Sequence, residues 1–194
     1  MRLATIRTGS RTTTAARIID EHRAVALDAP DVGTLLRSGD VAEGEEFTFA
    51  PRDLAPVIPR PGKIICVGLN YAKHIAEMGH EQPDVPTLFI KYPEALIGPY
   101  DDAEVPDFNA DTLDFEGELA VIVGTRARHA TDGAAHIAGY SVINDYTQRH
   151  YQKRTQQWHQ GKSLEKTAGF GPWLDTEWQP GPTITTTVNG EVMQ

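Results

Sequence analysis

Cysteine, long apolar runs and an excess of basic residues are features that this sequence of 194 residues lacks. Cys66 is the single cysteine, so an internal disulfide is excluded, and its place in the apolar segment 63–68 predicts a small buried side chain. No apolar run approaches the about 20 residues of a membrane-spanning helix, and residues 1–7 lack the apolar region of a signal peptide. We expect a soluble cytoplasmic protein.

The charge balance argues against nucleic-acid binding. The chain carries 27 acidic and 18 basic residues, a formal net charge of −9, and its lysines and arginines form no cluster. Binding to nucleic-acid phosphates requires the opposite sign of charge. We therefore expect neither a nucleic acid nor a membrane among the partners.

Residues 1–57 are expected to form a small N-terminal domain. We predict within it strands over Arg2–Arg7 and Arg17–Leu27 and a short helix near Asp31–Ser38. Three prolines and a glycine in 55–62 are typical of a linker. In residues 58–194, short strands separated by glycine and proline predict a second domain that is mainly β, which places the protein in the α+β class.

The last residues predict a β-hairpin that stops early. Asn189-Gly190 is the residue pair most typical of a two-residue turn, and only four residues follow it. From so short a return strand we expect the chain to be truncated, with the C-terminal part of the second domain missing.

Three acidic residues are predicted to meet at one place. Glu116 and Glu118 are two positions apart at the start of an apolar, β-branched segment, so a strand would point both side chains to one face. Asp145 ends the apolar segment 137–145 and would supply a third carboxylate. Like charges so close repel each other, and a bound cation is the simplest remedy. Three oxygen donors suit Mg²⁺, Mn²⁺ or Ca²⁺ better than zinc.

Two alternatives compete with a metal site. Segment 107–118 carries acids where an EF-hand loop does, but Thr112 stands where that loop needs glycine, and Glu118 begins a strand rather than a helix, which excludes the motif. The other alternative is a set of solvated surface acids, because three further aspartates make the stretch acidic. Acids that enter a buried strand without a partner are unfavourable, which favours the metal site.

His74 and Glu77 form a second candidate group. They lie three residues apart in a predicted helix that ends before Gly79, so they share one helical face. A histidine oriented by a carboxylate can activate water. The alternative is a solvated surface pair without a chemical role.

Arg149, Gln152 and Lys162 follow Asp145 in the chain. Arg149 and Gln152 are four and seven residues after Asp145, the spacing of one helical face. Arg149 could bind a substrate carboxylate and Gln152 could donate to an oxyanion, whereas the alternative for Arg149 is a salt bridge to Asp145. Gly-Lys-Ser at 161–163 lacks the upstream glycine of a nucleotide-binding loop. Lys162 is thus either a point charge for an anionic centre or an ordinary surface lysine.

The order of these motifs resembles the fumarylacetoacetate hydrolase family over about residues 60–194. The motifs are Val67-Gly-Leu-Asn-Tyr71 with His74 and Glu77, Leu88-Phe-Ile-Lys91 with Ile97-Gly-Pro99, Asp114-Phe-Glu-Gly-Glu-Leu-Ala-Val121, Asn144-Asp-Tyr-Thr-Gln-Arg149 and Gly161-Lys-Ser163. The resemblance implies a mixed β-roll core, a small N-terminal domain and a homodimer. It also implies Mg²⁺, with Mn²⁺ or Ca²⁺ as alternatives, held by Glu116, Glu118 and Asp145.

The resemblance further implies residue roles and a reaction. His74 and Glu77 fall on the family's lid helix and water-activating pair, while Arg149, Gln152 and Lys162 fall on positions that hold the keto-acid end of the substrate and its oxyanion. The implied enzyme is a hydrolase of aromatic catabolism that cleaves a C–C bond in a 2,4-diketo acid through a metal-stabilised enolate. An isomerase or decarboxylase acting on a 2-keto or 2-hydroxydienoic acid, and a non-catalytic metal-binding fragment, are the alternatives.

Three departures from the family pattern stand out. His150 occupies a position where relatives usually have an acid, and Glu94 one where they often have a serine. The late Thr- and Gly-rich loop that closes the family's substrate site has no counterpart in these 194 residues, in keeping with the expected truncation.

Overall fold

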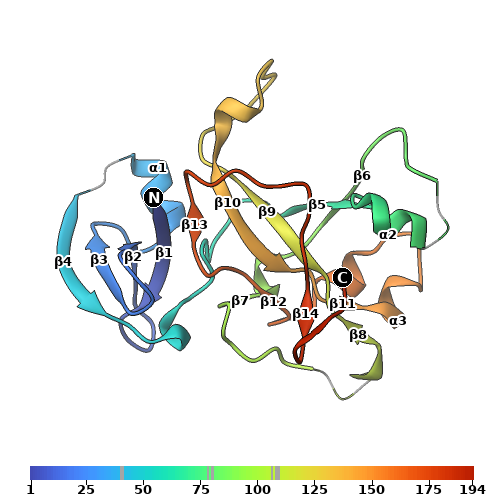
Figure 1. The fold of residues 1–194 in the computed structure, drawn as a ribbon, viewed down its shortest axis with the longest axis horizontal. Helices are drawn as coiled ribbons and strands as arrows, with labels where there is room; N and C mark the ends of the chain where they lie inside the picture. The colour runs from blue at the N-terminus through green and yellow to red at the C-terminus, as the bar shows by residue number, and fades with distance from the viewer. Residues whose placement is uncertain (40–41, 78, 80, 106, 108–109) are drawn as a thin grey trace.

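The computed structural model describes residues 1–39, 42–77, 79, 81–105, 107 and 110–194. Strands prevail over helices, as the sequence predicted, and the N-terminal strands lie at the opposite end of the molecule from α2 and α3 (Figure 1). None of the helices in the described residues combines the length and the hydropathy of a membrane-spanning segment.

A sheet of seven strands in the order β4-β3-β2-β1-β13-β10-β9 organises the molecule, and each neighbouring pair is antiparallel. Its strands are β1 (Arg2–Arg7), β2 (Thr13–Ile18), β3 (Arg23–Leu27), β4 (Glu43–Thr48), β9 (Gly117–Val123), β10 (Ile137–Asn144) and β13 (Leu174–Asp175). The pairing of β1 with β13 joins the N-terminal strands to the later part of the chain, because Leu3 faces Leu174 there.

The other strands form four two-stranded sheets. These are β5 (Ile65–Gly68) with β6 (Thr87–Ile90), β7 (Leu96–Ile97) with β12 (Ala168–Gly169), β8 (Leu113–Asp114) with β11 (Thr147–Gln148), and β14 (Thr187–Val188) with β15 (Glu191–Val192). The α-helices are short: α1 (Val32–Ser38), α2 (Ala72–Glu77), α3 (Arg149–Gln152) and α4 (His159–Lys162). The described residues also form four 3₁₀ turns: η1 (Pro51–Asp53), η2 (Pro93–Ala95), η3 (Ala110–Thr112) and η4 (Ala134–His136).

Two predictions about the N-terminal region are confirmed and one is wrong. Strand Arg2–Arg7 is present, and α1 begins after Asp31, whose carboxylate accepts a hydrogen bond from the N–H of Thr34. The predicted strand Arg17–Leu27, however, is divided between β2 and β3. The carboxylate of Asp20 accepts hydrogen bonds from the backbone N–H groups of two following residues, and these bonds close a turn between the strands.

The main core connects the two parts of the chain. Leu3, Leu27 and Val32 pack with Phe170 and Leu174 in one buried cluster. A second cluster, around Ile6 and residues of the neighbouring strands, covers the opposite face of β1, as the alternation of side chains along a strand requires. The parts before and after residue 57 thus share a sheet and a core, while the division into two domains stays a prediction.

The predicted hairpin near residue 190 is confirmed. β14 and β15 pair in antiparallel fashion across Asn189 and Gly190, whose φ angles are 52° and 87°. Positive φ at both central residues is the backbone conformation that the favoured two-residue hairpin turn requires.

Candidate metal and substrate site

The adjacent strands β9 and β10 bring the three predicted acids together. Glu118 of β9 pairs with Ile143 of β10, and the N–H of Asp145, directly after β10, donates to the backbone oxygen of Glu116 at 2.8 Å. One carboxylate oxygen from each acid lies within 4.8 Å of the other two. A hard divalent cation could reach all three oxygens at once.

The site is an unfavourable place for uncompensated negative charge. Asp145 is buried, with 1% of its surface exposed, while Glu116 and Glu118 are half-buried. Burial, followed by the negative charges of Asp145 and Glu116, raises the pKa of Glu118 to about 7. The carboxylates therefore need positive charge nearby.

Two buried lysines contact the acids directly. The ammonium of Lys162, at the end of α4, lies 2.5 Å from Oε2 of Glu116 and 2.7 Å from Oδ2 of Asp145. The ammonium of Lys91, directly after β6, lies 2.9 Å from Oδ1 of Asp145. Both side chains are almost completely buried, so the surface-lysine alternative for Lys162 is excluded.

Lys91 is a site residue that was not predicted from the sequence. Its Nζ also donates to the backbone oxygens of Tyr146 and Lys162, so it joins the end of β6 to the segments after β10 and in α4. Lysine is almost never fully buried unless it is paired. A lysine that ends an apolar strand was the signal that could have pointed to this pairing.

Arg149 forms ion pairs with Glu116 and Asp114. Its Nη1 lies 2.7 Å from Oε1 of Glu116 and donates to Oε1 of Gln152 at 3.0 Å. Its Nε and Nη2 contact Oδ2 of Asp114. Among the described residues no ion pair joins Arg149 to Asp145, so the alternative interpretation of Arg149, a salt bridge to Asp145, is excluded.

The helix α2 carries the predicted His74 and Glu77. The side chain of His74 lies outside the described part of the structure, and Glu77 is exposed. Directly before α2, the hydroxyl of Tyr71 accepts a hydrogen bond from the N–H of Leu119 at 3.1 Å. The beginning of α2 is therefore held next to β9, one residue beyond Glu118.

The donor set fits a divalent cation. Oδ1 of Asp145 is buried and receives no hydrogen bond from the described residues, because Lys91 approaches it at ion-pair distance without the direction of a hydrogen bond. A buried oxygen left in this way can act as a ligand. Three carboxylates with no sulfur or imidazole among them favour Mg²⁺, Mn²⁺ or Ca²⁺.

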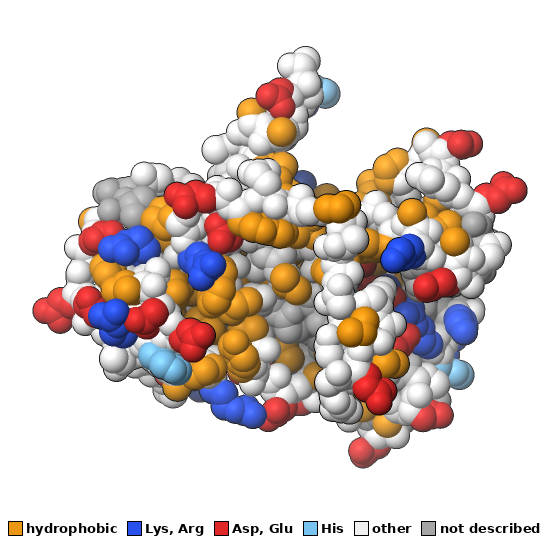
Figure 2. Space-filling view, viewed as in Figure 1, with side chains coloured by type: hydrophobic (Ala, Val, Ile, Leu, Met, Phe, Trp, Pro, Cys, Tyr) orange, Lys and Arg blue, Asp and Glu red, His pale blue; other side chains and the backbone are white. Residues whose placement is uncertain are grey.

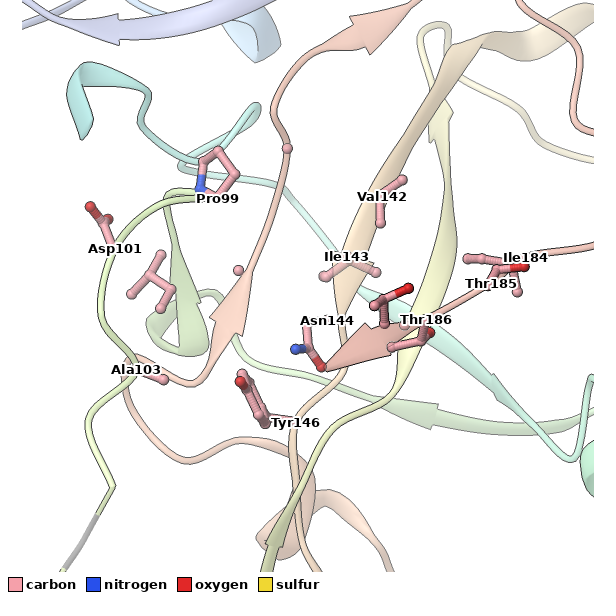
Figure 3. A pocket seen from close by; sticks show the side chains of 15 residues that line it. Pro99, Asp101, Ala103, Val142, Ile143, Asn144, Tyr146, Ile184, Thr185 and Thr186 are labelled. Carbon is pink, nitrogen blue, oxygen red and sulfur yellow. The ribbon is translucent and has the colours of Figure 1, made fainter. Parts of the chain in front are cut away.

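A cavity of about 430 Å³ lies beside this site rather than in it. Its walls come from Pro99 and Asp101 on one side and 184–187 on the other, with 142–144 of β10 between them (Figure 3). The space-filling view shows the hollow with hydrophobic side chains at its edge (Figure 2). Asn144 connects the cavity with the acidic site, because it lines the cavity and its side-chain oxygen accepts a hydrogen bond from the N–H of Glu116.

Comparison with known proteins gives consistent matches. Residues 63–194 match the family model described as "Fumarylacetoacetate (FAA) hydrolase C-terminal". "Oxaloacetate tautomerase FAHD2A, mitochondrial" of Bos taurus is 40% identical over 157 residues, which cover 77% of this chain and 48% of that protein. "Protein Rv2993c" of Mycobacterium tuberculosis is 39% identical over 149 residues, 74% of this chain and 55% of that protein. The chain spans about half the length of the curated relatives it matches.

Two solved structures show the same arrangement over the whole chain. A fumarylacetoacetate hydrolase from Exiguobacterium antarcticum superposes with a TM-score of 0.79 at 32% identity, covering 100% of this chain and 74% of that one. A 5-carboxymethyl-2-hydroxymuconate delta-isomerase from Mycobacterium smegmatis gives a TM-score of 0.79 at 28% identity with the same coverage. The mainly β architecture agrees with both.

Proposed function

The chain belongs to the fumarylacetoacetate hydrolase family, and on this premise we propose a divalent-metal-dependent enzyme that stabilises the enolate of a 2-keto acid. The observation that carries the proposal is the meeting of Glu116, Glu118 and Asp145 with the ammonium of Lys162. An enolate is an anion, and fixed positive groups in a site sheltered from water stabilise such a charge most strongly.

The three carboxylates would hold the cation, with Mg²⁺ as the first choice and Mn²⁺ or Ca²⁺ as alternatives. When bound, it would supply Lewis-acid polarisation of the keto-acid oxygens. Glu116 and Asp145 enter this role already held in place, Glu116 by Arg149 and Asp145 by Lys91.

Lys162 and Gln152 are the groups best placed to stabilise the enolate oxygen. The ammonium of Lys162 lies directly beside the acids. Gln152 accepts a hydrogen bond from Arg149 through its side-chain oxygen, so its amide N–H₂ is not the group that contacts Arg149. Arg149 uses four of its five N–H donors on Asp114, Glu116 and Gln152. Two-pronged binding of a substrate carboxylate by Arg149 would therefore require it to release Asp114 or Glu116.

Tautomerisation is the first candidate reaction. It moves one proton between C3 and the enol oxygen of a 2-keto acid and consumes no water, so the groups that stabilise the enolate suffice together with one proton acceptor. His74, oriented by Glu77, would be that acceptor. Relatives named oxaloacetate tautomerases and a structural neighbour named an isomerase support this choice.

Hydrolytic cleavage of a C–C bond in a 2,4-diketo acid, the reaction predicted from the sequence, is the second candidate. Here His74 would take a proton from water, the water oxygen would attack the distal carbonyl, and the bond between C3 and that carbonyl would break to leave an enolate and an acid. The anchoring of α2 beside Glu118 through Tyr71 favours it, since a water-activating pair must lie near the acids. The expected homodimer stays a prediction.

A thermal-shift titration with Mn²⁺, with and without oxalate, tests the common part of both candidates. Oxalate mimics the planar enolate of a 2-keto acid. We expect Mn²⁺ to raise the melting temperature and oxalate to raise it further, because a ligand of the folded state stabilises it by mass action. No shift from either would reject the metal site and favour a protein without this catalytic activity.

Product analysis separates the two reactions. The Mn²⁺-loaded protein is incubated with oxaloacetate, whose enol absorbs in the ultraviolet, and with an acylpyruvate. Faster loss of the enol signal with conservation of mass supports tautomerisation, whereas pyruvate and a second acid from the acylpyruvate support hydrolysis. If neither substrate reacts although the metal binds, the enolate proposal is wrong for these substrates.

A further inference from the structure

Every oxygen of Glu116 and Asp145 already faces a basic group. In Glu116, Oε1 faces Arg149 and Oε2 faces Lys162. In Asp145, Oδ1 faces Lys91 and Oδ2 faces Lys162. A divalent cation that uses one oxygen of each acid must therefore share that oxygen with a positive side chain or displace it.

Two of the three basic groups are held by further contacts. Lys91 donates to the backbone oxygens of Tyr146 and Lys162. Arg149 is bound by Asp114 on one side and by Gln152 on the other. Moving either group away from the acids would break these bonds as well.

Lys162 is held differently. Its ammonium makes hydrogen bonds to Glu116 and Asp145 and, among the described residues, to no other acceptor. The ring of Phe89 lies 5.1 Å from Nζ, and an aromatic face attracts an ammonium group. Displacing Lys162 from the acids would therefore break fewer other contacts than displacing Lys91 or Arg149. The ring of Phe89 could still attract its ammonium group.

The backbone of Lys162 is fixed, so only its side chain can move. Its carbonyl accepts from Lys91, and its N–H donates to the oxygen of Trp158 at 3.2 Å. A Cβ on Gly161 would lie 2.6 Å from the backbone nitrogen of Gln152, which shows that α4 packs backbone to backbone against α3. Displacement of the ammonium would be a local change of rotamer.

We propose that the ammonium of Lys162 and a divalent cation compete for the carboxylates of Glu116 and Asp145, and that metal binding turns this ammonium toward the substrate. The competition makes the enzyme bind its metal less tightly than three carboxylates alone would. When the metal is bound, the displaced ammonium of Lys162 would be available to stabilise the enolate. This inference rests on the metal-binding part of the proposed function.

The test is the affinity for Mn²⁺, measured by calorimetry and by the electron paramagnetic resonance signal of free Mn²⁺, without any substrate. Lys162→Met should bind Mn²⁺ about tenfold more tightly than the unchanged protein, because it removes both a competitor and a nearby positive charge. Lys162→Arg keeps the charge and should bind no more tightly. Lys166→Met, which removes a surface lysine paired with Glu104, should leave the affinity unchanged.

The outcomes separate this inference from the proposed function. If the unchanged protein binds no Mn²⁺, both fail. If it binds Mn²⁺ but folded Lys162→Met binds with equal or lower affinity, only the competition is overturned, and Lys162 then supports the metal site. Lys162→Gln removes the charge while keeping a hydrogen-bonding side chain, so it provides the same comparison if the Met variant does not fold.

Discussion

Lys91 and Asp145 form an ion pair that is closed to solvent. Their charged atoms lie 2.9 Å apart, and the exposed fractions of the two side chains are 0% and 1%. The pair connects the end of β6 with the residue directly after β10, and Lys91 adds bonds to two backbone oxygens there. Without Lys91, Asp145 would keep Lys162 as a partner but lose half of its positive surroundings, and two backbone oxygens would lose their donor. Breaking a buried ion pair in this way is strongly destabilising.

Lys91→Met should therefore lower the free energy of unfolding by about 3–5 kcal/mol. Urea denaturation in metal-free buffer measures it. Lys166→Met, which replaces an exposed lysine, is the matched control and should change the value by no more than about 0.5 kcal/mol. The double variant Lys91→Met/Asp145→Asn should lose less stability than the sum of the single changes. Strict additivity would show that the pair is not the source of the loss.

The sequence predicted the meeting of the three acids because short-range rules suffice for it. Alternation along a strand puts Glu116 and Glu118 on one face, and the end of the next strand delivers Asp145. The partners of Lys91 and Arg149 follow no such rule. Arg149 meets Asp114 only because β8 pairs with β11. Each of these strands has two residues, which is too short to show an alternation of apolar and polar residues in the sequence.

The N-terminal sheet shows the same limit. The edge strand β4, Glu43–Thr48, has no alternation of buried and exposed residues, since all but one of its side chains are exposed. Its sequence therefore carries no strand signal, and its pairing with β3 defines it instead. By contrast, Arg2–Arg7 places Leu3 and Ile6 in opposite cores, and its apolar composition was sufficient for a correct prediction.

Glu118→Gln should abolish the stabilisation by Mn²⁺, because it removes one of three charged ligands at nearly constant volume. In metal-free protein the same change should be stabilising at pH 8. The raised pKa of about 7 means that folding favours the protonated carboxyl, so stability falls as pH rises from the unfolded value through about 7. The gain should be on the order of 1–3 kcal/mol at pH 8 and absent at pH 4.

Thermal and urea unfolding at both pH values, with and without Mn²⁺, measure these effects. Glu165→Gln, which makes the same chemical change at an exposed position, is a control that should behave like the unchanged protein. A Mn²⁺-induced shift that survives Glu118→Gln would remove Glu118 from the metal site.

His74→Ala should lower turnover by about 10²- to 10⁴-fold, the usual contribution of a positioned acid or base. The affinity for Mn²⁺ should stay the same, because α2 supplies no carboxylate to the acidic cluster. Steady-state kinetics and a Mn²⁺ titration on one preparation measure both. Lys73→Ala on the same helix changes an exposed residue and serves as control. Full activity of His74→Ala would assign the proton transfer to another residue.

Cys66, which the sequence predicted to be buried, is only half-buried in the structure, and its thiol should still react slowly in the folded protein. Burial, followed by the negative charges of Asp145 and Glu118, raises the pKa of its thiol to about 12, and the thiolate is the form that reacts. Iodoacetamide at pH 8 should therefore label the protein slowly when folded and rapidly in urea, as mass spectrometry can follow. Because the pKa is raised, labelling of the folded protein should stay slow as the pH is increased to 10. Rapid labelling without urea would contradict the burial of this thiol.

Gly117 lies between two of the three acids, and a side chain there would collide with the segment before β14. A Cβ on Gly117 would lie 2.3 Å from Oγ1 of Thr186 and 3.5 Å from its Cβ. Gly117→Ala should therefore lower the free energy of unfolding by about 1–3 kcal/mol, the usual effect of overpacking, and weaken Mn²⁺ binding, because Glu116 and Glu118 must shift with the backbone. Thr186→Ala removes the oxygen but keeps the Cβ at an ordinary contact distance, so Gly117→Ala/Thr186→Ala should recover most of both losses.

Urea denaturation and Mn²⁺ titration of the two single variants and the double variant measure both effects. Recovery of stability and Mn²⁺ affinity would show that the segment before β14 packs against the acidic cluster and supports it. A double variant as impaired as Gly117→Ala would show that the loss arises from the backbone at position 117 itself.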